Sequence, residues 1–402
     1  MFKSIFRLSF MSCLALFSIT THAETKFLFT GDANVRAYFK NRTSSGGTQA
    51  FNQFFRLNTQ VKPDDNLTVK VGAVLASDNW EGDNHKSTSN SGTAIGGTND
   101  DGFGNGNITH LDHAVIEYNK NNWIMSAGRH AVSTPGSFLT SDDRRDRLML
   151  LKIRENYDVF AMAYDKRAEG SLTDSKDDLD MITVNYYGNW TGLRYALQGG
   201  YWYSKKFNNT TSLLNSANLH NIKMFAPQIE GKLGSIDFNF YYTILFGGKG
   251  AYYLDAHHAA ALKLAHDFEI VKLEFQSTAT LDGGFIANGF DTLSSVVNNS
   301  PDHNQSLIRL KSIGSGLGAK KADEYLNMLR ASKALSNDLT ASLGGGFGKI
   351  YNTTGGVLES STIYDATAKY TISPNLSVLA SYGKFFGDFK DHAGSLSLKA
   401  VF

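Results

Sequence analysis

The chain ends on a segment, AGSLSLKAVF at 393–402, in which apolar and polar residues alternate and whose last residue, Phe402, is aromatic. In an extended strand neighbouring side chains point to opposite faces, so this segment has one apolar face and one mostly polar face. At the end of a soluble sheet, such a strand would leave unpaired backbone groups open to other chains. Pairing with the first strand of the same chain removes that edge. The ending therefore favours a sheet that closes into a barrel.

The same alternation recurs along the chain after residue 24. Short polar turns, such as 63–66, alternate with long polar connections, such as 79–108 and 282–321. Counting the segments gives about 18 strands, with short turns at one end and long loops at the other, which is typical of a transmembrane barrel. We therefore predict an all-β fold: an antiparallel up-and-down transmembrane β-barrel with short periplasmic turns and long extracellular loops.

The composition fits strands better than helices. The sequence holds 38 Gly but 5 Pro, together with 18 Tyr and 27 Phe, which suits strands and tight turns. After the first 23 residues there is no run of about 18 apolar residues, the length that a transmembrane helix requires. A soluble β-sandwich stays open as an alternative, although it does not explain the regular exchange of short turns and long loops.

Residues 1–23 have the features of a secretory signal peptide. Lys3 and Arg7 precede an apolar run at 8–19, and the tripeptide THA at 21–23 is an A-x-A-like cleavage site. We predict that cleavage leaves a single barrel domain, 24–402.

Cleavage would also remove the one cysteine of the chain, Cys13. A mature chain without cysteine has no disulfide framework and no thiolate metal site. The loss of Lys3 and Arg7 would change the formal charge from +1 to −1. A charge so close to zero gives no reason to expect nucleic acid as a partner.

The parity of each strand predicts which side chains face the lumen. In a membrane barrel the apolar face meets lipid and the polar face lines the interior. The charged side chains predicted to line the pore are the cations Arg36, Lys40, Arg56, Lys62, Lys70, Lys272 and Lys399 and the anions Asp32, Asp237 and Glu274. Since cations exceed anions, we predict a modest preference for anions. For the strands at 157–166 and 323–332, the sequence does not show which alternate residues face the lumen.

The segment GRHAVSTPGSFLTSDDRRDRLMLLKIR at 128–154 is the best candidate for a functional site. We expect 129–147 to form a connection between two strands. In a soluble protein a charged run of this kind is usually a solvated face. In a pore, a loop folded into the lumen narrows it, and opposed carboxylates and guanidiniums create a transverse field that selects solutes. The residues predicted to form this constriction are Arg129, Asp142, Asp143, Arg144, Arg145, Asp146 and Arg147.

Two features resemble those of known families. The Gly128 and Arg129 pair that closes a strand, followed by a loop with an Asp-Arg cluster, is similar to the constriction region of Gram-negative porins, particularly the 18-stranded substrate-selective and alginate-export types. Those proteins usually carry Gln after the Gly-Arg pair, where this chain has His130. The terminal Phe402 resembles the signal that outer-membrane barrels present to the barrel-assembly machinery.

The resemblance implies a location in the outer membrane of a Gram-negative bacterium, in contact with lipid and lipopolysaccharide. It implies a passive diffusion channel for small hydrophilic solutes without a cofactor, and a homotrimer is a further implication, since porins commonly trimerise. The alternative is a closed barrel that acts as an adhesin, a structural protein or a membrane enzyme. The connection 282–321 keeps this alternative open, because it is long enough to plug the lumen.

Other patterns give weaker hypotheses. His110 and His113 with Asp112, or the pair at 257–258, offer metal-ligand residue types, but adjacent residues on a strand point to opposite faces. The glycine-rich run 96–107 resembles Gly-Asp loops that bind Ca²⁺, although a surface loop is the simpler interpretation. No pattern places a nucleophile beside a base, so we predict no enzymatic activity.

Overall fold

The computed structural model describes residues 25–43, 46–79, 110–154, 158–168, 179–203, 221–248, 255–298, 307–314, 322–352 and 357–402. The predicted signal peptide and the glycine-rich run at 96–107 lie outside these ranges. Across the described ranges, no helix has the length and apolar character needed to cross a membrane.

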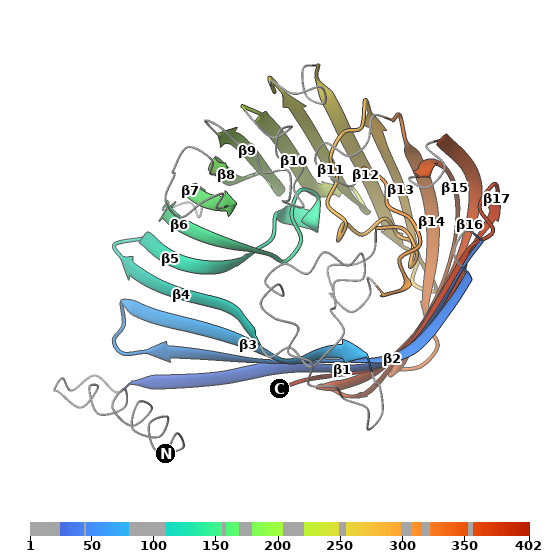
Figure 1. Ribbon diagram of the computed structural model, residues 1–402, viewed down its shortest axis with the longest axis horizontal. Helices are drawn as coiled ribbons and strands as arrows, with labels where there is room; N and C mark the ends of the chain where they lie inside the picture. Colours follow the sequence, from blue (N-terminus) through green and yellow to red (C-terminus); the bar gives the residue numbers. More distant parts are fainter. Residues whose placement is uncertain are drawn as a thin grey trace, which may run out of the picture.

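The described strands form one closed antiparallel sheet (Figure 1). Each strand pairs with its neighbours in sequence, and β1 pairs with both β2 and β18, so the sheet has no open edge. The 18 strands are β1 Lys26–Arg42, β2 Gly46–Lys62, β3 Leu67–Asn79, β4 His110–Lys120, β5 Trp123–Val132, β6 Asp143–Ile153, β7 Val159–Ala168, β8 Leu179–Trp190, β9 Leu193–Tyr203, β10 Lys223–Leu233, β11 Ile236–Phe246, β12 His257–Asp267, β13 Lys272–Leu281, β14 Tyr325–Ala334, β15 Leu339–Asn352, β16 Val357–Ser373, β17 Leu376–Gly387 and β18 His392–Val401. The predicted all-β barrel is confirmed.

Tight turns join the strands at one end of the barrel. Asn121 and Asn122, between β4 and β5, have φ of 52° and 63°, and Thr191 and Gly192, between β8 and β9, have φ of 49° and 87°. Two consecutive left-handed residues form the turn whose twist matches that of a hairpin. Longer connections, such as the one between β13 and β14, lie at the other end. The predicted asymmetry of turns and loops is therefore present in the fold.

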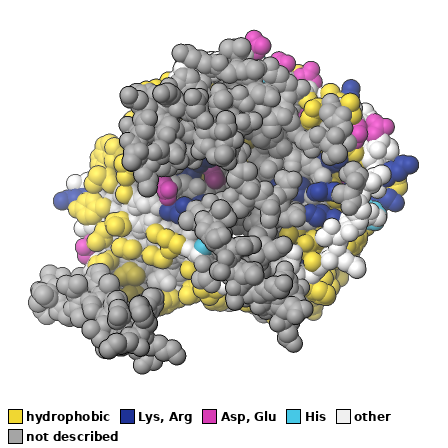
Figure 2. Space-filling view, in the orientation of Figure 1, with side chains coloured by type: hydrophobic (Ala, Val, Ile, Leu, Met, Phe, Trp, Pro, Cys, Tyr) yellow, Lys and Arg dark blue, Asp and Glu magenta, His cyan; other side chains and the backbone are white. Residues whose placement is uncertain are grey.

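Alternate residues separate an exposed apolar outer face from a covered inner face. On β11, Phe240 and Phe246 are exposed, whereas Tyr241 and Thr243 are buried. Figure 2 shows many hydrophobic side chains along the outer left edge of the ring, and charged side chains both near its centre and around its margin. On β7, where the sequence left the parity open, Asp165 is among the buried residues. An apolar outer band around a polar interior suits a lipid environment.

The chain ends meet at the seam between β1 and β18. Gly31 N donates to Phe402 O at 2.7 Å, and Phe402 N donates to Gly31 O at 3.0 Å. A Cβ on Gly31 would lie 2.5 Å from Cζ of Phe402, so the terminal ring lies against a position that only glycine leaves open. Because Lys399 pairs with Asn34 in this register, the same strand carries the seam and a residue predicted to line the lumen.

We expect Gly31→Ala to weaken this seam, because the added methyl group would meet both the Phe402 ring and the backbone oxygen of Arg56, 2.6 Å away. The folded fraction after refolding into detergent, read from the mobility shift between unheated and heated samples on a gel, should fall clearly below that of the wild type. Gly47→Ala is the matched control, since the nearest atom to its Cβ would be 3.9 Å away. Equal refolding of the two variants would contradict the role given to the terminal ring.

Two loops fold into the ring and contribute to both of its apolar clusters (Figure 1). The β5–β6 loop, residues 133–142, packs Phe138 and Leu139 against the inner faces of β8 to β12. The β13–β14 loop, whose described parts are 282–298, 307–314 and 322–324, packs Val296 and Ile313 against the inner faces of β14 to β18 and β1. Both loops pack on strands beyond the two that they connect, so long-range apolar burial positions them.

Candidate functional site

The β5–β6 loop crosses the interior from β5 and β6 to β11. The Phe138 ring stacks on Tyr241 of β11, with ring centroids 5.4 Å apart, and meets Phe290 edge-on at 5.0 Å. Ala287 N donates to Phe138 O at 2.8 Å, which joins this loop to the β13–β14 loop. Stacked and edge-on aromatic pairs stabilise a buried contact beyond their area. The tip of the loop is therefore anchored on the opposite wall.

Side-chain bonds hold the loop in its turn. The Thr134 hydroxyl accepts from Leu139 N and Thr140 N, both at 3.1 Å, and Thr134 N donates to Thr140 O at 3.0 Å. Gly136 lies in η2 Pro135–Ser137 with φ 63°. A Cβ at this residue would lie 2.3 Å from the Tyr241 hydroxyl. Glycine at this position therefore permits two things: the left-handed backbone conformation and the close approach of the loop to Tyr241 of β11.

The strands flanking the loop are longer than predicted, which corrects the boundaries drawn from the sequence. The predicted connection 129–147 shrinks to 133–142, because β5 continues to Val132 and β6 begins at Asp143, with these two residues paired. The backbone hydrogen bonds between β5 and β6 therefore continue through the charged residues 143–147. Of the seven residues predicted to form the constriction, Asp142 alone lies in the loop, and the others lie on β5 or β6.

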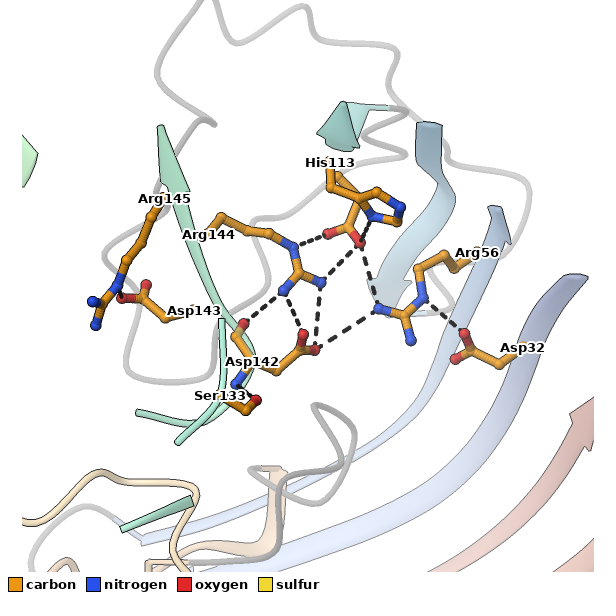
Figure 3. A network of polar contacts seen from close by, with 9 residues as sticks. Asp32, Arg56, His113, Ser133, Asp142, Asp143, Arg144 and Arg145 are labelled. Carbon is orange, nitrogen blue, oxygen red and sulfur yellow. Dashed lines mark hydrogen bonds and ion pairs between the residues drawn. The ribbon is translucent and has the colours of Figure 1, made fainter. Parts of the chain in front are cut away.

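The first group of charges, which we call the Arg144 cluster, joins the four strands β1, β2, β4 and β6 to the β5–β6 loop (Figure 3). Arg144 donates to both carboxylate oxygens of Asp112 at 2.7 and 2.8 Å and to the carbonyl oxygen of Asp142 at 2.8 Å. Arg56 donates to Asp32 at 2.7 Å and to Asp112 at 3.4 Å. The members are Asp32, Arg56, Asp112, Asp142 and Arg144. Paired two-point contacts of this kind fix the orientation of the guanidinium groups.

The second group, the Asp165 cluster, lies further along the same wall. Asp165 has no exposed side-chain surface and accepts from Arg145 at 3.0 Å and from Arg147 at 2.5 and 2.8 Å. Asp143 accepts from Arg145 at 2.9 Å and from Arg167 at 3.0 Å. Arg145 also donates to the Thr140 hydroxyl of the β5–β6 loop at 2.8 Å. This cluster therefore ties the loop to β6 and β7.

Arg129 and Asp146 do not join these clusters. They lie 3.7 Å from each other, and 64% of the Asp146 side chain is exposed. Asp146 shares its parity on β6 with Arg144, but the Arg144 side chain is 13% exposed and bonds to Asp112, whereas Asp146 makes no such contact among the described residues. The structure thus separates these two residues from the other five of the predicted set.

A third group, the Glu274 cluster, lies on the far wall. Glu274 accepts from Arg330 at 2.7 and 2.9 Å and lies 3.0 Å from Lys263 and 3.5 Å from Lys272. Asp291 of the β13–β14 loop lies within 4.0 Å of Lys263 and Arg330. The inner wall therefore carries opposed charges on two sides of the ring.

The remaining residues predicted to line the pore have varied settings. Lys70 pairs with Glu117 at 2.8 Å, and Asp237 pairs with Lys232 at 3.3 Å near a tight turn, where both side chains are exposed. Arg36 and Lys40 are buried on the inner parity of β1.

Sequence reasoning missed Asp112, Asp165, Lys263, Asp291 and Arg330. The alternation of β12 carried a usable signal for Lys263, since His257, Ala259, Ala261 and Ala265 are buried on the same parity. Arg330 likewise shares its parity on β14 with the buried Leu326 and Met328. Asp112 lies at an irregularity of β4, and Asp291 lies in the β13–β14 loop, so alternation gives no signal for these two.

Two of the histidines considered as metal ligands have hydrogen-bond partners within the protein. Nδ1 of His113 lies 3.4 Å from Asp112, and His257 bonds to the carbonyl oxygen of Asp282. Among the residues that the structure describes, no group of three or more His, Cys, Asp or Glu side chains could hold a metal ion.

Comparison with solved structures gives close agreement in fold at low sequence identity. The chain is similar to OccAB3 of Acinetobacter baumannii (TM-score 0.61, 10% identity, covering 94% of this chain and 99% of that one). It is also similar to OpdK of Pseudomonas aeruginosa, solved with vanillate (0.61, 13%, 94% and 100%), and to OccK9 (OpdG) of the same organism (0.62, 12%, 94% and 98%). No family model matches the chain, and no curated protein matches it. The chain therefore has the fold of these outer-membrane proteins over nearly its whole length.

Proposed function

We propose that the protein is a porin of the Gram-negative outer membrane, a passive channel for small hydrophilic solutes that the β5–β6 loop constricts. The anchoring of Phe138 on Tyr241, across the interior from β5 and β6, carries this proposal. A loop held in this way narrows the path that solutes take through a barrel of this size. The likeness in fold to solved outer-membrane proteins supports the same conclusion.

The charge clusters would act on a solute at the narrowest level. The Arg144 and Asp165 clusters lie on the β1 to β7 wall, and the Glu274 cluster lies on the wall of β12 to β14. A solute between them would exchange part of its hydration for these fixed donors and acceptors. Because each arginine is held by carboxylates, the donors keep their orientation while solutes pass.

We also propose a modest preference for anions. The Arg144 cluster has two cations against three anions, whereas the Asp165 cluster has three cations against two anions. The Glu274 cluster likewise has three cations against two anions. Together the three clusters hold eight cations and seven anions. The small excess of cations predicts weak rather than strong selectivity.

We expect Arg144→Gln to lower the preference for anions, because it leaves three carboxylates of its cluster facing one arginine. The measurement is the reversal potential of the purified protein in planar bilayers under a KCl gradient, with vanillate as a second test anion. Arg129→Gln is the matched control, since Arg129 pairs with Asp146, which is not a member of the Arg144 cluster. If the two variants shift the reversal potential equally, or neither shifts it, the Arg144 cluster does not line the path.

A closed barrel is the second candidate, and the β13–β14 loop favours it. The described parts of this loop pack on the inner faces of six strands, which reduces the free cross-section. Single-channel recording decides between the two functions: discrete, stable ionic currents support a porin, and a silent, correctly folded barrel supports an adhesin, a structural protein or a membrane enzyme.

The partners proposed for a porin are lipid and lipopolysaccharide around the apolar outer band and the barrel-assembly machinery at Phe402. Native mass spectrometry in detergent distinguishes a homotrimer from a monomer.

A further inference from the structure

A pocket of about 220 Å³ lies between the β5–β6 loop and the inner face of β8 to β11. Its lining includes Pro135 of the loop, Ala196, and the three aromatic residues Tyr187, Tyr195 and Tyr241. Its size is below the ~300–1,000 Å³ of pockets that hold drug-sized ligands, so it suits a single ring. None of its lining residues belongs to the three charge clusters.

Gln228, on β10, is the unusual member of this lining. Its side chain is 3% exposed, and neither its amide nitrogen nor its amide oxygen has a hydrogen-bond partner among the described residues. The buried Gln198 on the neighbouring strand differs, because it donates to the Tyr187 hydroxyl at 3.1 Å. Buried polar groups normally have partners. The Gln228 amide therefore offers one acceptor and two donors to a molecule in the pocket.

The charge of the pocket narrows the choice of ligand. Arg194 and Glu230, the charged residues of the lining, form an ion pair at 2.9 Å, so the pocket is neutral as a whole. An anion would meet Glu230, and a cation would meet Arg194. A hydroxyl group both donates and accepts hydrogen bonds, as the Gln228 amide does. The faces of Tyr187 and Tyr241 suit the C–H face of a ring.

We propose that this pocket is a binding subsite for a neutral hydroxylated ring, of the size and chemistry of a monosaccharide. The inference rests on the proposed channel function and adds to it a stopping point for uncharged solutes, apart from the charge clusters. Bound sugar would lie beside the anchored loop and would slow the passage of ions. Gln228 would hold the hydroxyl groups, and Tyr187 and Tyr241 would hold the ring.

The probe is D-glucose, added to the full mature protein in planar bilayers. We expect a saturable fall in KCl conductance and a matching binding isotherm by calorimetry in detergent. Sorbitol, an open-chain polyol of similar size, should act more weakly. Gln228→Leu should weaken both glucose effects by about tenfold or more, because sites that bind hydroxyl groups depend strongly on their polar partners.

Gln60→Leu is the matched control, with the same chemical change at an inner position of β2 outside the pocket. It should leave the glucose effects intact. If Gln228→Leu fails to fold, Gln228→Asn, which keeps the amide but withdraws it, replaces it with the same expected direction. Absence of any ionic current would overturn the channel function. Normal current with only a linear, viscosity-like glucose effect and no binding heat would overturn the subsite alone, as would equal glucose affinity in the Gln228 variant.

Discussion

Gly136→Val should raise the single-channel conductance by roughly twofold or more, since the current through a water-filled pore depends on its narrowest section. A Cβ at this position would lie 2.3 Å from the Tyr241 hydroxyl and 2.5 Å from its Cζ. The Tyr241 ring is held between Phe138 and Phe290, so it has little room to retreat. The loop tip must therefore leave β11, and with it the anchor that holds the loop across the interior.

A control variant, Gly192→Val, distinguishes the effect of the steric clash with Tyr241 from the effect of backbone strain. Gly192 also has positive φ, +87°, but no atom lies within 4 Å of its Cβ position. Gly192→Val therefore carries the cost of a β-branched residue in the left-handed region without touching the loop. We expect it to keep the wild-type conductance. A Gly136 variant with unchanged conductance would show that the β5–β6 loop does not set the narrowest section.

The barrel itself follows from short-range rules that the sequence displays openly. Alternation places Phe240 outside and Thr243 inside, and pairs such as Thr191 and Gly192 mark the tight turns. Such patterns depend on near neighbours in sequence, so strand order and face were predictable. The seam between Gly31 and Phe402 was predictable in outline from the amphipathic ending.

The limits of β5 and β6 were not predictable in this way. A run of charged residues at 142–147 is typical of a loop, yet the β5–β6 ladder continues through most of it. Where strands of a barrel extend toward the rim, their inner face is polar, and paired charges replace apolar side chains without ending the ladder. Near the rim of the barrel, a run of polar residues in the sequence is therefore a poor predictor of where a strand ends.

An irregular strand explains why Asp112 was missed. The register between β3 and β4 shifts next to Asp112, which lies between the paired residues Leu111 and His113. A bulge changes which residues face inward, and local alternation does not reveal it. Asp165, in contrast, continues a regular alternation with the buried Ala161 and Ala163 on β7. The contact between Phe138 and Tyr241 depends on the closed barrel, and its one sequence signal was an apolar pair in a polar loop.

Asp165→Asn should produce the largest loss of stability among the charged positions. The carboxylate has no exposed surface and bonds to two guanidiniums, those of Arg145 and Arg147, which are themselves about one-tenth exposed. Removing one partner from a buried ionic group costs about 3–5 kcal/mol, because the remaining charge stays desolvated. We place the effect toward the lower end, since Asp143 continues to bind Arg145.

The matched control is Asp237→Asn, where the ion pair with Lys232 is exposed on both sides. Pairs of that kind contribute about 0–1 kcal/mol, so the midpoint of guanidinium unfolding in detergent should barely move for Asp237→Asn and fall clearly for Asp165→Asn.

The same variants test the channel: loss of the Asp165 charge leaves three arginines facing Asp143 alone, which should strengthen the preference for anions. A destabilised Asp165 variant with unchanged reversal potential would make the Asp165 cluster a purely structural device, because burial would then shield its charges from passing ions.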